Sequence, residues 1–278
     1  KPTLGLFSTR GVVPACRSLD AVSIFSLTTE DAALVSSVAG GFDPLEPYSR
    51  PAQQPPNRGW SQRSPFRFAV PHVSQREFLR NDAYARLYEQ SITALARLGG
   101  EPVSVDIAPL LEAARLLYQG PWVTERFLAV GSLIENRPEA LLPVTRQIIC
   151  GGSRGTARET FRALYRLREL QRLSEAIWSV ADVLLLPTTP NHPTIAAVEA
   201  EPLLRNTELG HYTNFANLLD LAAVAVPAGF TPAGLPFGVS LMAPAWNDAE
   251  LLWLASRLQR ACVETMGARG HRLAGTIA

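Results

Sequence analysis

Apolar and polar residues recur along this chain in two periods, one typical of helices and one typical of strands. Apolar side chains fall three to four residues apart over Asn81–Leu98, which predicts an amphipathic helix. A helix over Thr28–Ala39 is indicated by Thr28 as N-cap and by acidic residues in the first turn. Further helices are predicted over Pro109–Tyr118, Pro121–Ile134, Pro138–Cys150, Thr156–Ala181, Asn214–Leu221 and Asp248–Thr265.

Short, continuously apolar runs between these helices predict strands that are buried on both faces. They cover Phe66–Val70, Pro102–Ile107, Asp182–Leu186, Ala223–Ala228 and Phe237–Met242. Helices that alternate with such strands are typical of an α/β sandwich, in which helices cover both faces of a central sheet. We expect residues 1–278 to form a single domain.

Residues 42–65 interrupt this alternation with six prolines and many polar side chains. A strand signal begins immediately afterwards, at Phe66. A long surface excursion is therefore the favoured interpretation, and a linker between domains is the alternative.

Composition narrows the classes of function. The formal net charge is +1, and the 26 basic residues are spread along the chain, so neither a nucleic-acid footprint nor a membrane-surface patch is expected. No apolar run reaches the ~20 residues of a membrane span. Three well-separated cysteines favour a reducing compartment. The first residues of the chain have the composition of a domain interior. We expect the chain to be part of a longer protein whose start is missing.

Most candidate chemical groups have ordinary interpretations. The run Gly151–Gly155 (GGSRG) lacks the spacing of a P-loop or a nucleophile elbow, and it is expected to end one helix and cap the next. The four histidines, His72, His192, His211 and His271, show no metal-ligand spacing.

Two isolated acids and one strand end are further candidate sites. Asp20 and Asp220 are expected to cap turns or form salt bridges. Pro187–Pro190 (PTTP) follows a predicted buried strand, where a plain turn and a pocket wall both remain open.

The segment LLYQGPWVTER (116–126) is the strongest functional candidate. A Gly-Pro break separates two predicted helices, with Tyr118 before it and Arg126 after it. Arg126 precedes an apolar run on a helix expected to be largely buried, and a buried arginine usually meets an anion. An exposed or salt-bridged Arg126 is the alternative.

Several stretches resemble the amidase signature family. They are Lys1–Thr3, Gly11–Pro14, Ser18–Asp20, the run DVLLLPTTP and Ala223–Pro244. Within that family, Gly41–Pro51, Leu116–Arg126 and Tyr212–Phe230 resemble the allophanate hydrolases.

The resemblance implies an α/β/α sandwich with a mixed sheet, and hydrolysis of the terminal amide of allophanate with release of ammonia. It implies a Ser–cis-Ser–Lys triad that lies upstream of Lys1, so that no catalytic residue falls in this chain and Lys1 is not the catalytic lysine. Tyr118 and Arg126 are implied to bind substrate.

The resemblance also implies that neither a metal nor another cofactor takes part. It implies a cytoplasmic homodimer with a functional link to urea carboxylase. Two alternatives remain: an amidase for a non-carboxylated amide such as biuret, and an inactive fragment or structural subunit.

Overall fold

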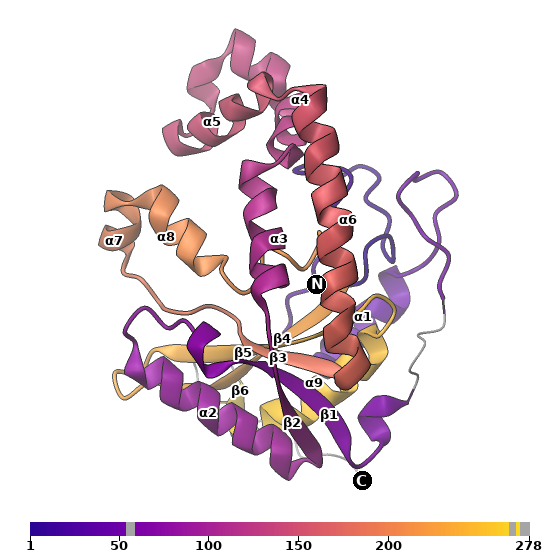
Figure 1. Ribbon diagram of the computed structural model, residues 1–278, viewed down its shortest axis with the longest axis vertical. Coiled ribbons are helices and arrows are strands. Elements are labelled where there is room, and N and C mark those ends of the chain that lie inside the picture. Colours follow the sequence, from indigo (N-terminus) through magenta and orange to yellow (C-terminus); the bar gives the residue numbers. More distant parts are fainter. Residues whose placement is uncertain (54–58, 267–270, 273–278) are drawn as a thin grey trace.

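The computed structural model describes residues 1–53, 59–266 and 271–272, and a five-stranded sheet lies at its centre (Figure 1). The strands are β1 (Phe66–Pro71), β2 (Gly100–Val105), β3 (Val183–Pro187), β4 (Leu221–Phe230) and β5 (Pro236–Pro244), in the order β2-β1-β3-β5-β4. β1 runs parallel to β2 and β3, whereas β5 is antiparallel to β3 and β4. The sheet is therefore mixed, as the resemblance implies.

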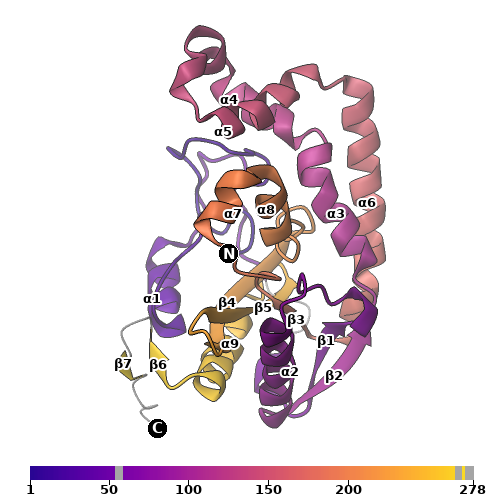
Figure 2. The ribbon, with the colours of Figure 1, turned by 90° about the vertical axis from the view of Figure 1, so that its left-hand side faces the viewer.

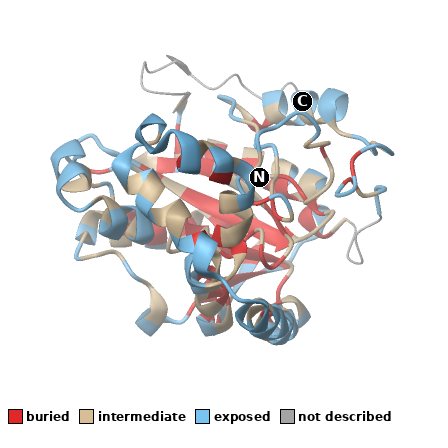
Figure 3. Cartoon of the chain, turned by 90° about the horizontal axis from the view of Figure 1, so that it is seen from above, coloured by how far each residue is buried: buried red, intermediate tan, exposed pale blue. Residues whose placement is uncertain are grey.

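β3 is buried on both faces, which explains its unbroken apolar run. Leu184 and Leu186 belong to the core beneath α3 (Ala108–Gln119) and α6 (Ala157–Val180). Val183 and Leu185 belong to the opposite core, beside α2 (Asp82–Arg97) and α9 (Asp248–Cys262). Successive side chains of a strand point to opposite faces, so one apolar run supplies two cores. Figures 2 and 3 show the helices on both sides and the buried residues gathered in the central strands. The predicted sandwich is confirmed.

The helix α2 begins and ends close to its predicted bounds. Asn81 caps it by accepting a hydrogen bond from the backbone N–H of Tyr84. Tyr88 then donates its hydroxyl to the backbone carbonyl of Leu185, at 2.7 Å, which ties the helix to the sheet. The closing helix, α9, ends earlier than predicted, and Thr265–Met266 (β6) pairs instead with His271–Arg272 (β7).

The helices α3 and α6 rise from the sheet and carry an arm at their far end (Figure 1). The arm holds α4 (Trp122–Asn136) and α5 (Pro143–Cys150). A capping box between Thr156 and Glu159 starts α6. Arg166 of α6 binds Glu112 of α3 through two parallel hydrogen bonds of 2.6 and 2.8 Å, which join the two long helices.

Two helix predictions were wrong. The segment 138–150 splits into a 3₁₀ turn, Pro138–Ala140, and α5, because Pro143 has no N–H to donate and restrains Leu142 to an extended backbone. The segment 214–221 forms consecutive turns instead of a helix. Asp220 adopts a left-handed backbone (φ 52°), and Leu221 already pairs in β4.

Two short helices were not predicted: α7 (Ile195–Ala200) and α8 (Pro202–Leu209). Both had sequence signals. Thr194 caps α7 by accepting from the backbone N–H of Ala197, and Pro202 occupies the first turn of α8.

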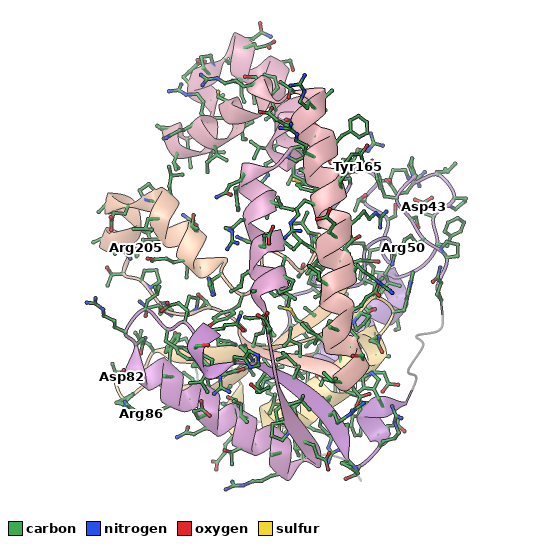
Figure 4. The ribbon with its side chains drawn as sticks, in the orientation of Figure 1. Asp43, Arg50, Asp82, Arg86, Tyr165 and Arg205 are labelled. Atoms are coloured by element: carbon green, nitrogen blue, oxygen red, sulfur yellow. The ribbon has the colours of Figure 1, made fainter. Side chains whose placement is uncertain are left out.

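The described parts of the proline-rich segment are attached to the fold at both ends. Helix α1 (Thr29–Ala39) precedes it, with Thr28 as the predicted N-cap. Arg50 pairs with Asp220 at 2.6 Å, and Glu250 of α9 accepts the backbone N–H of Gly59 at 2.7 Å. Figure 4 shows Arg50 beside the loops that carry Asp43. These attachments fit a surface excursion.

Candidate functional site

A cavity of about 730 Å³ opens between the arm and α8. Tyr118, Arg126, Gly152 and Arg154 line it from the arm, and Leu203 and Asn206 line it from α8. The two walls come from residues about 50 to 90 positions apart in the sequence. In Figure 2, α8 lies below α4 and α5, which agrees with this arrangement.

The Gly-Pro break brings Tyr118 and Arg126 together. Helix α3 ends at Gln119, Gly120 is its C-cap, and Pro121 is the N-cap of α4. The Cζ atom of Arg126 lies 5.0 Å from the centroid of the Tyr118 ring. Residues eight apart on an unbroken helix would lie roughly 12 Å apart along its axis. Both side chains therefore face one cavity, as the corner was predicted to allow.

Arg126 keeps its charge in a half-buried position. Burial opposes that charge, but interactions with the Cys16 thiol and the Tyr118 hydroxyl outweigh it and raise the pKa of Arg126. Its Nε atom is buried without a hydrogen-bond partner among the described residues. A guanidinium with this unused donor at a cavity wall is suited to binding an anion.

The helix that carries Arg126 is less buried than predicted. Only Trp122, Val123, Gly131 and Ile134 of α4 are buried, and Leu128 is 78% exposed. The reason is the position of α4 in the arm, where its first residue, Trp122, still reaches the core beneath α3 and α6 while the rest of the helix extends away from the sheet (Figure 1). Arg126 does not form a salt bridge with any described residue.

The glycine run has part of the predicted role and an additional one. Gly151–Arg154 forms a 3₁₀ turn. The Ser153 hydroxyl donates to the carbonyl of Cys150, a hydrogen bond within that turn. The helix stop is confirmed, because Gly151 is the C-cap of α5, but the N-cap of α6 is Thr156, the residue after the run. Gly152 also packs against the backbone of α4, where a Cβ atom would lie 2.3 Å from the Val123 carbonyl oxygen. The sequence did not reveal that this turn is a cavity wall.

The opposite wall, α8, is stabilised by its own ion pairs. Arg205 pairs with Glu201 at 2.5 Å and with Glu208 at 2.8 Å, and Figure 4 marks its position. Pairs at these spacings support a short helix modestly. Leu203 and Asn206 of the same helix line the cavity.

The two isolated acids have the structural roles that were predicted. Asp20 accepts the backbone N–H groups of Ala15 and Cys16 at 3.0 and 2.9 Å. Asp220 forms the salt bridge with Arg50. Neither group faces the 730 Å³ cavity.

The PTTP segment forms a turn against the neighbouring strand. Thr188 donates its backbone N–H to Gly238, and its hydroxyl lies 2.9 Å from that of Ser240. In the described part of the chain, residues 187–190 line neither the cavity beside the arm nor a smaller cavity beside β4. The chain bends at Thr188 and Pro190 directly after β3, which fits the first of the two interpretations left open.

The histidines lie apart from one another. His72 is exposed and lies 2.8 Å from Ser104, and His192 is exposed as well. His211 is half-buried, and burial lowers its pKa. The side chain of His271 falls outside the described residues. Among the residues described, no group of three His, Cys, Asp or Glu side chains could hold a metal ion, and no helix is long and apolar enough to cross a membrane.

The smaller cavity, of about 420 Å³, lies beside β4 and includes Lys1. Its charged groups already serve the fold. Lys1 donates its amine to the carbonyl of Leu221, and Asp248 accepts both the N–H and the hydroxyl of Thr3. Among its described lining residues, this cavity has no arginine stacked on an aromatic ring as Arg126 is on Tyr118.

Comparison with known proteins identifies the family and similar chains. The family model "Amidase" matches residues 1–252. Urea amidolyase of Saccharomyces cerevisiae is 41% identical over 265 residues, which cover 92% of this chain and 14% of that protein. The allophanate hydrolase structure of Kluyveromyces lactis is 38% identical with a TM-score of 0.89, and the match covers 99% of this chain and 45% of that one.

The fold extends to more distant structures. The structure of 6-aminohexanoate cyclic dimer hydrolase shares 21% identity, with a TM-score of 0.74 over 94% of this chain and 60% of that chain, which shows a common fold alone. The chain thus spans less than two thirds of the relatives it matches. On the match of the family model over most of its length, the chain belongs to the amidase family.

Proposed function

We infer that this chain forms the substrate wall and much of the scaffold of an allophanate hydrolase. The enzyme would hydrolyse the terminal amide of allophanate and release ammonia. The observation that carries the proposal is the pairing of Tyr118 with Arg126 at the 730 Å³ cavity. The similarity to an allophanate hydrolase at 38% identity supports it.

The chemistry of the substrate fits these two side chains. Allophanate is a urea that bears a carboxylate, so its recognition requires a cation beyond the scissile amide. A guanidinium can hold a carboxylate through two parallel bonds, each worth about 1.5–3 kcal/mol. The Tyr118 hydroxyl can donate to a substrate oxygen, while its ring restrains the guanidinium from one side.

The nucleophilic chemistry is assigned to residues outside this chain. In this proposal a Ser–cis-Ser–Lys triad upstream of Lys1 attacks the amide carbonyl, and backbone N–H groups bind the oxyanion. Residues 1–278 would then be the C-terminal part of one amidase domain.

We also propose a cellular setting for this enzyme. Three free cysteines fit the reducing cytoplasm. The similarity to urea amidolyase supports a link to urea carboxylase, whose product would supply the substrate. We propose a homodimer, which light scattering of the complete enzyme would test directly.

The decisive experiment compares two substrates of nearly equal shape. Biuret carries a neutral amide where allophanate carries its carboxylate. In the complete enzyme, Arg126→Ala should raise KM for allophanate by at least about 10- to 100-fold, as expected for the loss of one charge-assisted bond, and should change KM for biuret little. An equal loss on both substrates would overturn the carboxylate-binding role and favour an amidase for neutral amides.

A second assay addresses the non-enzymatic alternative. The mass of the purified protein and its release of ammonia from allophanate should be measured on the same sample. Turnover by a polypeptide that truly begins at Lys1 would contradict the placement of the nucleophile upstream. Absence of turnover in the complete enzyme would favour a structural subunit.

A further inference from the structure

The loop Ala15–Leu19 is fastened to the first turn of α4 by a single carboxylate. Glu125 accepts the backbone N–H of Ser18 at 2.8 Å, and its second oxygen accepts the Ser18 hydroxyl. Acidic residues in a first turn often serve the N-terminus of their own helix. Here Glu125 instead binds a residue 107 positions away in the sequence. The arrangement therefore joins two segments that would otherwise be independent.

The remaining contacts of the loop leave it little freedom. Asp20 accepts the N–H groups of Ala15 and Cys16, which closes the loop on itself. Asn217 donates its side-chain amide to the carbonyl of Leu19 at 2.7 Å, and the Cys16 thiol lies 3.4 Å from the carbonyl of Trp122. Cys16 is consequently held against α4, with 4% of its surface exposed.

The fixed thiol forms one side of the space that Arg126 occupies. The guanidinium lies 5.0 Å from the centroid of the Tyr118 ring and also interacts with the Cys16 thiol. Arginine has many rotamers, and holding it in one of them costs side-chain entropy unless neighbours restrict it beforehand. Cys16 and Tyr118 provide that restriction, and Cys16 stays in place through the Glu125–Ser18 link.

We propose that Glu125 and Ser18 are positioning residues, which hold the Cys16 loop against α4 so that Arg126 is set for an anionic substrate. Neither residue needs to touch the substrate. This inference rests on the proposed function, because it assumes that Arg126 binds the carboxylate. It adds that the selectivity for a carboxylated amide depends on a loop whose residues do not line the cavity themselves.

The kinetic test uses the complete enzyme with Glu125→Gln, Ser18→Ala and Ser18→Thr. The first two should raise KM for allophanate about tenfold while changing KM for biuret by less than about twofold. Ser18→Thr keeps the hydroxyl and should restore the wild-type KM. The matched control is Glu112→Gln, which weakens a comparable carboxylate link between α3 and α6.

A second readout follows the loop directly. Alkylation of Cys16, identified by mass spectrometry of its peptide, should be about ten times faster in Glu125→Gln than in the wild type, and unchanged in Glu112→Gln. Cys150 and Cys262 are more exposed than Cys16 and serve as internal references. Ser18→Ala is the milder change and keeps the test available if Glu125→Gln does not fold.

The outcomes separate this inference from the proposed function. If Arg126→Ala affects allophanate and biuret equally, the proposed function fails. If Arg126→Ala is selective but Glu125→Gln and Ser18→Ala are not, or if Cys16 reacts no faster in them, the positioning role is overturned.

Discussion

The guanidinium carbon of Arg126 lies 5.0 Å from the centre of the Tyr118 ring, across a break between two helices. Neither α3 nor α4 alone could produce this contact. It depends on Gly120, which ends one helix, and on Pro121, which begins the next. The stacking of a cation on an aromatic face is worth about 0.5–2 kcal/mol, depending on exposure.

Tyr118 should therefore show a graded response to substitution. Tyr118→Phe keeps the ring under Arg126 and removes the hydroxyl, whereas Tyr118→Leu removes both. KM for allophanate in the complete enzyme should rise a few-fold in the first variant and about tenfold or more in the second. Identical kinetics in the two variants would show that the ring does not restrain Arg126.

The glycine run offers a pair of neighbouring substitutions with opposite expectations. A Cβ atom at Gly152 would lie within 3 Å of three backbone atoms of Val123 and Thr124, so Gly152→Ala must push the turn away from α4. A Cβ atom at Gly151 meets nothing within 4 Å. We expect kcat/KM for allophanate to fall at least about tenfold in Gly152→Ala, since catalytic sites tolerate displacements of an ångström poorly. Gly151→Ala should retain near wild-type kcat/KM, and comparable losses in both variants would refute the steric explanation.

Tyr88 tests the link between α2 and the sheet. Its fully buried hydroxyl donates to the Leu185 carbonyl at 2.7 Å, and burial raises its pKa. Tyr88→Phe removes the donor and should destabilise the fold by about 1 kcal/mol, or lower Tm by about 2 °C. Tyr165→Phe is the control, because Tyr165 is 65% exposed on α6 (Figure 4). Equal Tm changes in both variants would contradict the assignment.

Glu30 should make the attachment of α1 to α9 sensitive to acid. Hydrogen bonds from Ser256 and Arg260 lower the pKa of Glu30 from 4.5 to about 2. A lowered pKa in the folded state stabilises the protein above the unfolded-state pKa, and this stabilisation is lost as pH falls from about 4.5 towards 2.

The Tm of Glu30→Gln should therefore lie below that of the wild type at pH 7, and the difference should shrink as pH falls below about 4. Glu139→Gln, at an exposed position on the arm, is the control. The difference is expected to be modest because the Glu30 side chain is 54% exposed. A difference that is constant between pH 7 and pH 3 would show that the charge of Glu30 is irrelevant.

Local chemistry in the sequence determined most of the regular elements. The apolar run of β3, the amphipathic pattern of α2 and the capping box of α6 are properties of neighbouring residues, so they could be predicted without the fold. Two of the differences have local causes too. Pro143 breaks the helix predicted over Pro138–Cys150, and Pro202 begins the unpredicted α8.

Only the tertiary structure decided how these elements combine into a site. A short helix was predicted over Asn214–Leu221, but Phe215, Leu218 and Leu219 are buried there while the chain turns towards β4. Burial of those side chains outweighed helix propensity, which is a weak preference.

The sequence by itself singled out Tyr118 and Arg126 as a candidate pair at a helix break. It could not show that α8 forms the facing wall, nor that Glu125 fastens the Cys16 loop beside Arg126. Those contacts join residues about 50 to 110 positions apart. Their proximity results from the packing of the whole arm and sheet, and no spacing within a single segment records it.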